Sequence, residues 1–230
     1  MVMDYSALSE RVASVRETIA RQQQAGGWSH PVTIVAVTKT HGAEAVRSAA
    51  AAGLTAVGEN RVQEALAKMA LVPDVPIEWH LIGSLQRNKV RQVVGRFAVV
   101  HSVDRLELAE EFAHRLPSGK RQRVLVEVNC ADEPQKAGVL PGALPGLLEA
   151  LGAMPAIALE GLMTMAPLTN DVTVLRAAFR RLRTLREEAE RRGLWLPHLS
   201  MGMSGDYPVA VAEGATMVRL GTILFGERRP

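Results

Sequence analysis

The stretch that decides the fold is Val32-Thr33-Ile34-Val35-Ala36-Val37-Thr38-Lys39. It is apolar, rich in β-branched residues and about as long as one strand. An uninterrupted run of this kind predicts a strand buried on both faces, as in a parallel sheet. Lys39 closes the run, and because an ammonium group is costly to bury, a lysine there calls for an explanation.

Further strand-like segments follow along the chain, and helix-like segments separate them. We predict strands over residues 32–39, 55–60, 78–83, 97–103, 123–130, 156–165, 198–204 and 215–221. We predict helices over residues 4–24, 43–53, 61–70, 86–95, 104–116, 141–151, 171–192 and 207–213. The pattern is clearest over 171–192, where Leu175, Phe179, Leu182 and Leu185 form one apolar stripe.

This alternation of strands and helices indicates an α/β fold with a parallel sheet. The chain of 230 residues shows no linker, low-complexity stretch or repeat. We therefore expect a single domain over 1–230, a closed (β/α)8 barrel of the TIM type with the first helix as an addition. The alternative is an open doubly wound sheet, but no G-x-G-x-x-G motif follows the first strand to support its dinucleotide-binding form.

Composition narrows the class of protein. Hydrophobic residues make up 47% of the chain and charged residues 22%, which is typical of a soluble globular protein. The net charge of +3 is too small to indicate nucleic-acid binding, and we interpret the arginines over 176–192 as a solvated helix face. The single cysteine, Cys130, excludes an internal disulfide and a paired-cysteine metal site, so we expect no metal. Nothing resembles a signal peptide or a membrane span, so we expect a cytoplasmic protein.

Polar residues gather at the predicted strand ends, where a barrel carries its active site. Two interpretations of Lys39 are open at this end of the barrel. It is either a solvated strand end or a partly desolvated amine, which would be nucleophilic and able to form a Schiff base with an aldehyde. His80 on the third predicted strand and Asn60 after the second belong to the same end of the barrel.

The last two strand ends suggest an anion site. Ser204 precedes the helix over 207–213 and is either its N-cap or a phosphate ligand. Gly221 and Thr222 add a close backbone approach and a second hydroxyl, and loops after strands seven and eight recurrently bind phosphate in this fold. Asp206 is interpreted as a capping residue.

Arg219 lies in an apolar strand, where a guanidinium must find an acceptor. It either pairs with a barrel carboxylate such as Glu59 or Glu127 or donates to a ring nitrogen of a cofactor. A Schiff-base lysine, a phosphate site and an arginine facing a pyridine nitrogen together indicate pyridoxal 5′-phosphate.

Long motifs resemble the pyridoxal phosphate homeostasis proteins, formerly described as proline synthetase co-transcribed proteins. They read VAVTKT over 35–40, GENRVQE over 58–64, WHLIGSLQRNK over 79–89, LSMGMSGD over 199–206 and VRLGT over 218–222. The resemblance runs from about residue 5 to 227 and implies a barrel like the N-terminal domain of alanine racemase. Small departures from the family pattern occur at Thr38, Leu81 and Gly205.

The resemblance also implies roles for individual residues. Lys39 would be the aldimine lysine, Arg219 would face the pyridine nitrogen, and Lys136 matches a family loop near the barrel mouth. The remaining cofactor contacts would come from Asn60, Met163, Ser204, Gly221 and Thr222, with His80 as a possible accessory residue.

Alanine racemase needs a second base from a separate domain, and no obvious one is found here, since Tyr5 and Tyr207 lie away from the predicted site. An arginine at the pyridine nitrogen would also leave the ring a weak electron sink. We therefore predict no catalytic residues and a protein that holds the cofactor and releases it to apo-enzymes or free amino acids, as a monomer or weak dimer. The alternatives are a pyridoxal phosphate-dependent racemase or decarboxylase of low activity and a barrel enzyme acting on sugar phosphates.

Overall fold

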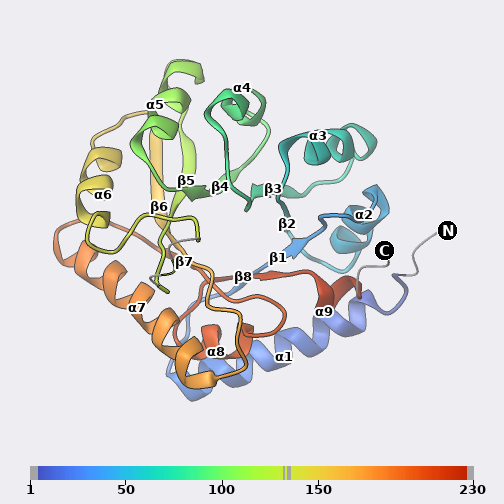
Figure 1. Cartoon of the computed structure of the whole chain (residues 1–230). Helices are drawn as coiled ribbons and strands as arrows, with labels where there is room; N and C mark the ends of the chain where they lie inside the picture. Colours follow the sequence, from blue (N-terminus) through green and yellow to red (C-terminus); the bar gives the residue numbers. More distant parts are fainter. Residues whose placement is uncertain (1–4, 132, 134–135, 227–230) are drawn as a thin grey trace.

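A computed structural model describes residues 5–131, 133 and 136–226 of the chain. Its strands close into one parallel barrel in the order β1 to β8, with β1 hydrogen-bonded to β8 (Figure 1). The barrel predicted from the sequence is thereby confirmed, and the open sheet is excluded. Residues 1–4, 132, 134, 135 and 227–230, including the predicted first residue of the first helix, lie outside the described part.

The eight strands are those predicted, but all are shorter. They are β1 (Thr33–Val37), β2 (Ala56–Glu59), β3 (Glu78–Leu81), β4 (Val99–Val103), β5 (Gln122–Glu127), β6 (Ile157–Met163), β7 (His198–Ser200) and β8 (Met217–Leu220). The predicted strands extended too far at one or both ends, because residues that flank the hydrogen-bonded ladder continue the strand-like sequence without belonging to the sheet. Lys39 and Ser204 accordingly lie in loops beyond their strands.

The helices surround the barrel. They are α1 (Leu8–Gly26), α2 (Ala43–Ala51), α3 (Val62–Leu71), the 3₁₀ turn η1 (Arg87–Lys89), α4 (Val90–Val93), α5 (Leu106–Arg115), α6 (Leu144–Gly152), α7 (Val172–Arg191), α8 (Tyr207–Ala212) and α9 (Thr222–Phe225). The helix predicted over 86–95 is split into η1 and α4, and α9 was missed because one turn carries no periodicity. Pro145 fixes the start of α6 later than predicted, since proline favours the first turn of a helix.

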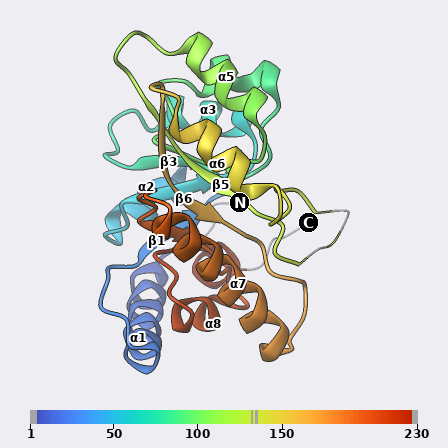
Figure 2. The same ribbon diagram turned by 90° about the vertical axis from the view of Figure 1, so that its left-hand side faces the viewer.

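The added first helix is confirmed. It packs along α8 (Figures 1 and 2) and also contacts α9 (Figure 1). Its apolar residues Leu8, Val12, Val15 and Ile19 recur at helical spacing and are buried. It ends at Gly26, and the following Gly27 has a φ of 73°, the left-handed conformation that glycine adopts after a helix C-terminus.

The predicted stripe of α7 is buried at Leu175, Phe179 and Leu182. The arginines on the opposite face of α7 are not simply a solvated surface, as the sequence suggested. Arg176, Arg180 and Arg183 all pair with the buried carboxylate of Glu213, and so tie α7 to the end of α8.

The barrel interior is layered. Val99, Leu125 and Met217 form an apolar cluster inside it. Side chains two residues apart on a strand share a face, so the next layer toward the C-terminal ends consists of His101, Glu127 and Arg219. All three are buried. The fold thus places a polar layer directly beneath the face where sites occur in such barrels.

Candidate functional site

A cavity of about 250 Å³ opens at the C-terminal ends of the strands. Most of the residues predicted to contact a cofactor line it, namely Lys39, Asn60, Ser204, Arg219, Gly221 and Thr222. Because β1 and β8 are neighbours in the closed barrel, residues from opposite ends of the sequence meet at one opening.

Lys39 lies two residues beyond β1, in a turn closed by a hydrogen bond of 3.0 Å from His41 N to Thr38 O. Its side chain is half-buried and lines the cavity. Thr40 in the same turn has a φ of 69°, the only positive φ of a non-glycine residue in the described ranges. This conformation is sterically unfavourable for a β-branched residue, so the turn has to be held by its surroundings.

Ser204 bonds to the loop after β8 and not to α8. Its Oγ accepts hydrogen bonds from Gly221 N at 3.3 Å and Ile223 N at 3.2 Å, at the start of α9. Asp206 occupies the N-cap position of α8, but its carboxylate accepts from Met203 N and so stabilises the preceding turn. Burial raises the pKa of the Asp206 carboxyl. The bonds of Ser204 thus join the loop after β7 to the loop after β8, and the two loops together form one polar wall of the cavity.

Arg219 is buried, and its guanidinium is held by oxygen atoms of two neighbouring strand ends. Nη1 donates to Ser200 O and Ser200 Oγ at 2.8 Å each, and Nη2 donates to Thr164 O at 3.0 Å. Burial lowers the pKa of Arg219 to about 10, against the opposing effect of Glu127, so the group stays charged at neutral pH. Glu59, one of the carboxylates considered as an alternative partner for Arg219, bonds to Lys68.

His80 belongs to a buried chain of side chains beneath the cavity. Its Nδ1 lies 2.9 Å from Nε2 of His101, whose Nδ1 lies 2.9 Å from Ser200 Oγ. On the other side, His80 Nε2 lies 3.4 Å from Glu78 at the N-terminal end of the barrel. Burial lowers the pKa of His80 to about 4 and that of His101 well below its ordinary value, so both rings are neutral.

Two residues that the resemblance implied stand apart from the cavity lining. Met163 is buried inside the barrel with the apolar cluster, while Met165 and Met203 line the opening. Lys136 pairs with Glu133 at 2.6 Å and donates to Ala166 O at 3.1 Å, so it links the loops after β5 and β6.

Sequence reasoning missed some residues at or near the cavity. His41 lines it, with Nδ1 3.2 Å from the Tyr5 hydroxyl. Its position two residues after Lys39 was the available signal. His101 and Ser200 gave no signal, because each lies in a buried strand whose partners are distant in sequence.

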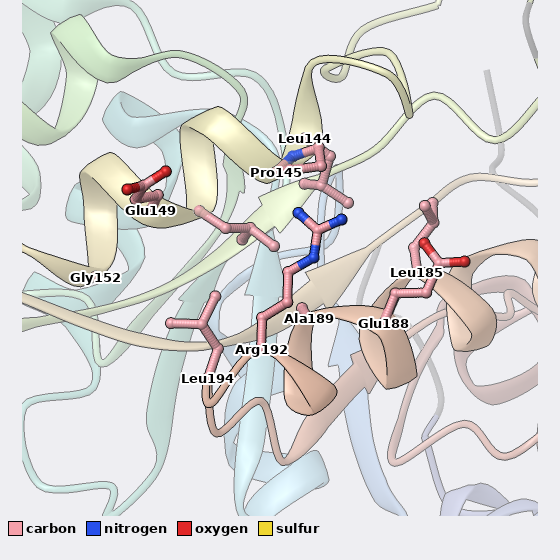
Figure 3. A pocket seen from close by; sticks show the side chains of 10 residues that line it. Leu144, Pro145, Glu149, Gly152, Leu185, Glu188, Ala189, Arg192 and Leu194 are labelled. Atoms are coloured by element: carbon pink, nitrogen blue, oxygen red, sulfur yellow. The ribbon is translucent and has the colours of Figure 1, made fainter.

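A larger cavity of about 380 Å³ lies outside the barrel, between α6 and α7 (Figure 3). Leucine side chains line it together with Glu149, Glu188 and Arg192, whose side chain extends across the middle of the cavity. No cluster of polar groups comparable to the one at the strand ends converges there, so we assign the functional site to the barrel cavity.

Within the described ranges, no group of three or more histidine, cysteine or acidic side chains is arranged to hold a metal ion. In the same part of the chain, none of the helices combines the length and the apolar character that crossing a membrane requires.

Comparison with known proteins identifies the class. The profile of the family "Alanine racemase, N-terminal domain" matches residues 4–229. An alanine racemase from Corynebacterium glutamicum shares the fold at 18% identity and a TM-score of 0.76, over 98% of this chain and 62% of that one.

Closer relatives are more specific. The pyridoxal phosphate homeostasis protein of Aquifex aeolicus is 43% identical over 96% of this chain and 98% of its own length, and that of Pseudomonas aeruginosa is 44% identical over 97% and 96%. PipY of Synechococcus elongatus, solved with PLP bound, is 40% identical with a TM-score of 0.83, over 95% of this chain and 100% of that chain. The chain therefore belongs to the alanine racemase N-terminal domain family and, within it, to the pyridoxal phosphate homeostasis proteins. The family membership that the sequence motifs indicated is confirmed.

Proposed function

We propose that this chain binds pyridoxal 5′-phosphate in the barrel cavity, with Lys39 as its covalent anchor, and that it stores and releases the cofactor. The observation that carries the proposal is the convergence of three groups on one cavity. These are the Lys39 amine, the Arg219 guanidinium and the polar wall built by Ser204 with the loop after β8. The relatives named above support it.

The donor set fits the three parts of the cofactor. Pyridoxal 5′-phosphate supplies an aldehyde with which a lysine amine condenses reversibly, forming a C=N bond and releasing one water. Ser204 Oγ already accepts two backbone N–H bonds, so its own hydrogen remains available for an anion. Thr222 at the start of α9 adds a second hydroxyl, and Asn60 lines the same cavity.

Arg219 supports storage over turnover. Its three bonds to Ser200 and Thr164 use three of its five N–H groups and fix the guanidinium plane. A permanently charged donor facing a pyridine nitrogen keeps that nitrogen unprotonated, which makes the ring a weak electron sink. A site of this kind holds the cofactor without activating it strongly.

The proposal extends to the biological role. The protein would act as a single domain over 1–230, as a monomer or weak dimer in the cytoplasm. It would keep the reactive aldehyde bound and deliver it to apo-enzymes that use pyridoxal phosphate or to free amino acids.

The test is a visible spectrum of the purified protein after loading with pyridoxal 5′-phosphate, followed by borohydride reduction and peptide mapping. We expect a yellow protein whose reduced adduct maps to Lys39, and a Lys39→Ala variant that is colourless. Lys120→Ala, in an exposed loop away from the cavity, is the matched control. A yellow band retained in Lys39→Ala, with the adduct on another residue, would refute the assignment.

One observation favours a second candidate, a racemase or decarboxylase of low activity. His41 brings an imidazole to the wall of the Lys39 cavity, and its hydrogen bond with Tyr5 fixes the ring. An imidazole beside the cofactor could serve as the second base that the sequence did not reveal. To test for such activity, protein loaded with pyridoxal 5′-phosphate is incubated with L-amino acids, and their chirality and the release of carbon dioxide are measured. Turnover well above that of free cofactor, lost in His41→Asn, would establish an enzyme.

A further inference from the structure

Lys68 of α3 is buried beneath the turn that carries Lys39, and it lies outside the lining of the cavity. Lys68 is 6% exposed, although it lies on a helix at the periphery of the barrel. Its Nζ donates to Thr38 O at 2.6 Å, to Glu59 Oε1 at 2.6 Å and to Glu64 Oε1 at 2.9 Å. An ammonium group has three N–H donors, so these bonds saturate it.

Lys68, Glu59 and Glu64 form a hydrogen-bonded cluster that holds the turn on both sides of Lys39. Before it, Lys68 binds the carbonyl of Thr38, and the Thr38 hydroxyl donates to Glu59 Oε1 at 2.6 Å. After it, the Thr40 N–H donates to Glu64 Oε1 at 2.7 Å. The backbone on either side of Lys39 is therefore bound to α3 and to the end of β2.

The cluster is not arranged for maximal stability. Glu59 is fully buried, and its Oε2 has no hydrogen-bond partner. Burial raises the pKa of Glu59, and bonds from Lys68 and Thr38 only partly offset this effect. A buried polar atom without a partner costs free energy, and such costs concentrate at functional sites. The strained φ of Thr40 is a second cost in free energy of the kind that concentrates at functional sites.

We propose that Lys68 is a positioning residue for Lys39, which it acts on through Glu59, Glu64 and the Thr38–His41 turn. The cluster holds the strained turn in the one conformation that presents the Lys39 amine to the cavity. This inference rests on the proposed function, because its consequence is measured through the cofactor aldehyde. It concerns only the aldehyde end of the site, since the polar wall for the phosphate comes from the loops after β7 and β8.

This separation defines the experiment. Pyridoxine 5′-phosphate has the ring and phosphate of the cofactor but an alcohol in place of the aldehyde. We measure dissociation constants for both compounds with Glu64→Ala, whose side chain is 28% exposed and is therefore tolerant of truncation. We expect affinity for pyridoxal 5′-phosphate to fall on the order of ten- to a hundred-fold, because small misplacements of a reacting group have effects of this size. Affinity for pyridoxine 5′-phosphate should stay within about two-fold of wild type.

A second variant addresses Lys68 directly. Removing the lysine alone would leave Glu59 as an uncompensated buried charge, so the variant is the double substitution Lys68→Met with Glu59→Gln. It should show the same selective loss of aldehyde binding. Hydrogen exchange of the Thr40 amide in cofactor-free protein gives an independent readout, and exchange should be faster in Glu64→Ala, which removes its acceptor.

Glu111→Ala is the matched control, because Glu111 forms an i,i+4 pair with Arg115 on α5, away from the cavity. Variants that bind pyridoxal 5′-phosphate like wild type would overturn the inference and leave the proposed function intact. An equal loss for both compounds would also overturn it, because it would show a general structural role. Wild-type protein that retains no pyridoxal 5′-phosphate would overturn the proposed function and this inference with it.

Discussion

Nη1 of Arg219 lies 2.8 Å from Oγ of Ser200, and this contact joins the cavity to a chain of hydrogen bonds beneath it. A guanidinium only donates, so Ser200 Oγ accepts from it, but a hydroxyl oxygen can accept twice and this bond alone does not orient the chain. The direction follows from the other end, where a carboxylate only accepts, so His80 Nε2 donates to Glu78. The neutral His80 ring then accepts at Nδ1 from His101 Nε2, and the neutral His101 ring accepts at Nδ1 from the Ser200 hydroxyl. Glu78 thus orients a polar chain that ends at Arg219.

This chain predicts the tautomers of two rings. His80 and His101 should both be neutral and protonated on Nε2 at neutral pH, since burial lowers the pKa of His80 to about 4 and that of His101 well below its ordinary value. Nitrogen chemical shifts of selectively labelled protein, followed against pH, measure both properties. The exposed His114 on α5 is the internal reference. An Nδ1-protonated ring, or protonation of either ring near neutral pH, would contradict the assigned direction.

The Ser200 hydroxyl should matter both for stability and for binding. Ser200→Ala removes the acceptor of Arg219 and leaves His101 Nδ1 buried without a donor, which should cost about 1–3 kcal/mol of unfolding free energy. The guanidinium also loses one of its three fixed bonds, so affinity for pyridoxal 5′-phosphate should fall several-fold. Denaturant unfolding and ligand titration test the two effects.

Ser102→Ala provides the control for this prediction. Ser102 is also buried, and its hydroxyl donates to Gly83 O at 2.7 Å, away from Arg219. Its loss should reduce stability and leave affinity unchanged. Equal affinities of both variants would show that the Ser200–Arg219 bond does not tune the site.

Glu127 should make stability depend on pH. Burial, with a contribution from Asp104, raises the pKa of Glu127 from 4.5 to about 7, while Arg219 acts in the opposite direction. Between these values the folded state keeps a proton that the unfolded state has lost, so stability falls as pH rises through this window. Above it the full cost, about 3 kcal/mol, is present.

Glu127→Gln removes this titration and keeps the shape of the side chain. The variant should be more stable than wild type at about pH 8, and the difference should shrink toward about pH 5, where Glu127 is protonated in the folded protein. Urea unfolding at both values measures the difference. A gain that is the same at both pH values would show that titration of Glu127 is not its source.

The barrel and the lining of its cavity could be predicted largely from sequence because both follow from local patterns. The run over 32–39 and its counterparts identify strands, and loops after consecutive parallel strands meet at one end. Lys39 and Arg219 stand out because each is a charge attached to an apolar strand. Where the hydrogen-bonded ladder stops is not encoded in hydrophobicity, so Lys39 was placed on β1 although it lies beyond it.

The supporting residues could not be predicted, and the reason is again physical. Lys68 follows Glu64 by four residues, like many lysines on exposed helix faces. Its burial depends on Glu59 and Thr38, which belong to other elements. Ser200 and His101 are joined across 99 sequence positions, and only the closed barrel brings them together. Polar networks of this kind leave no periodic signal.

Gly202 should be indispensable for the loop that carries Ser204. Its φ is 94°, and a Cβ there would lie 2.7 Å from Ala210 Cβ and 2.9 Å from Tyr207 Cα. Gly202→Ala should therefore cost about 1–3 kcal/mol of stability and weaken binding of pyridoxine 5′-phosphate, because the strain falls on the turn before α8. Gly205, where the family usually has another residue, is the matched control, since a Cβ there meets nothing within 4 Å. Gly205→Ala should leave stability nearly unchanged. If both alanine variants unfold at the same denaturant concentration as wild type, the left-handed turn at Gly202 does not constrain the loop.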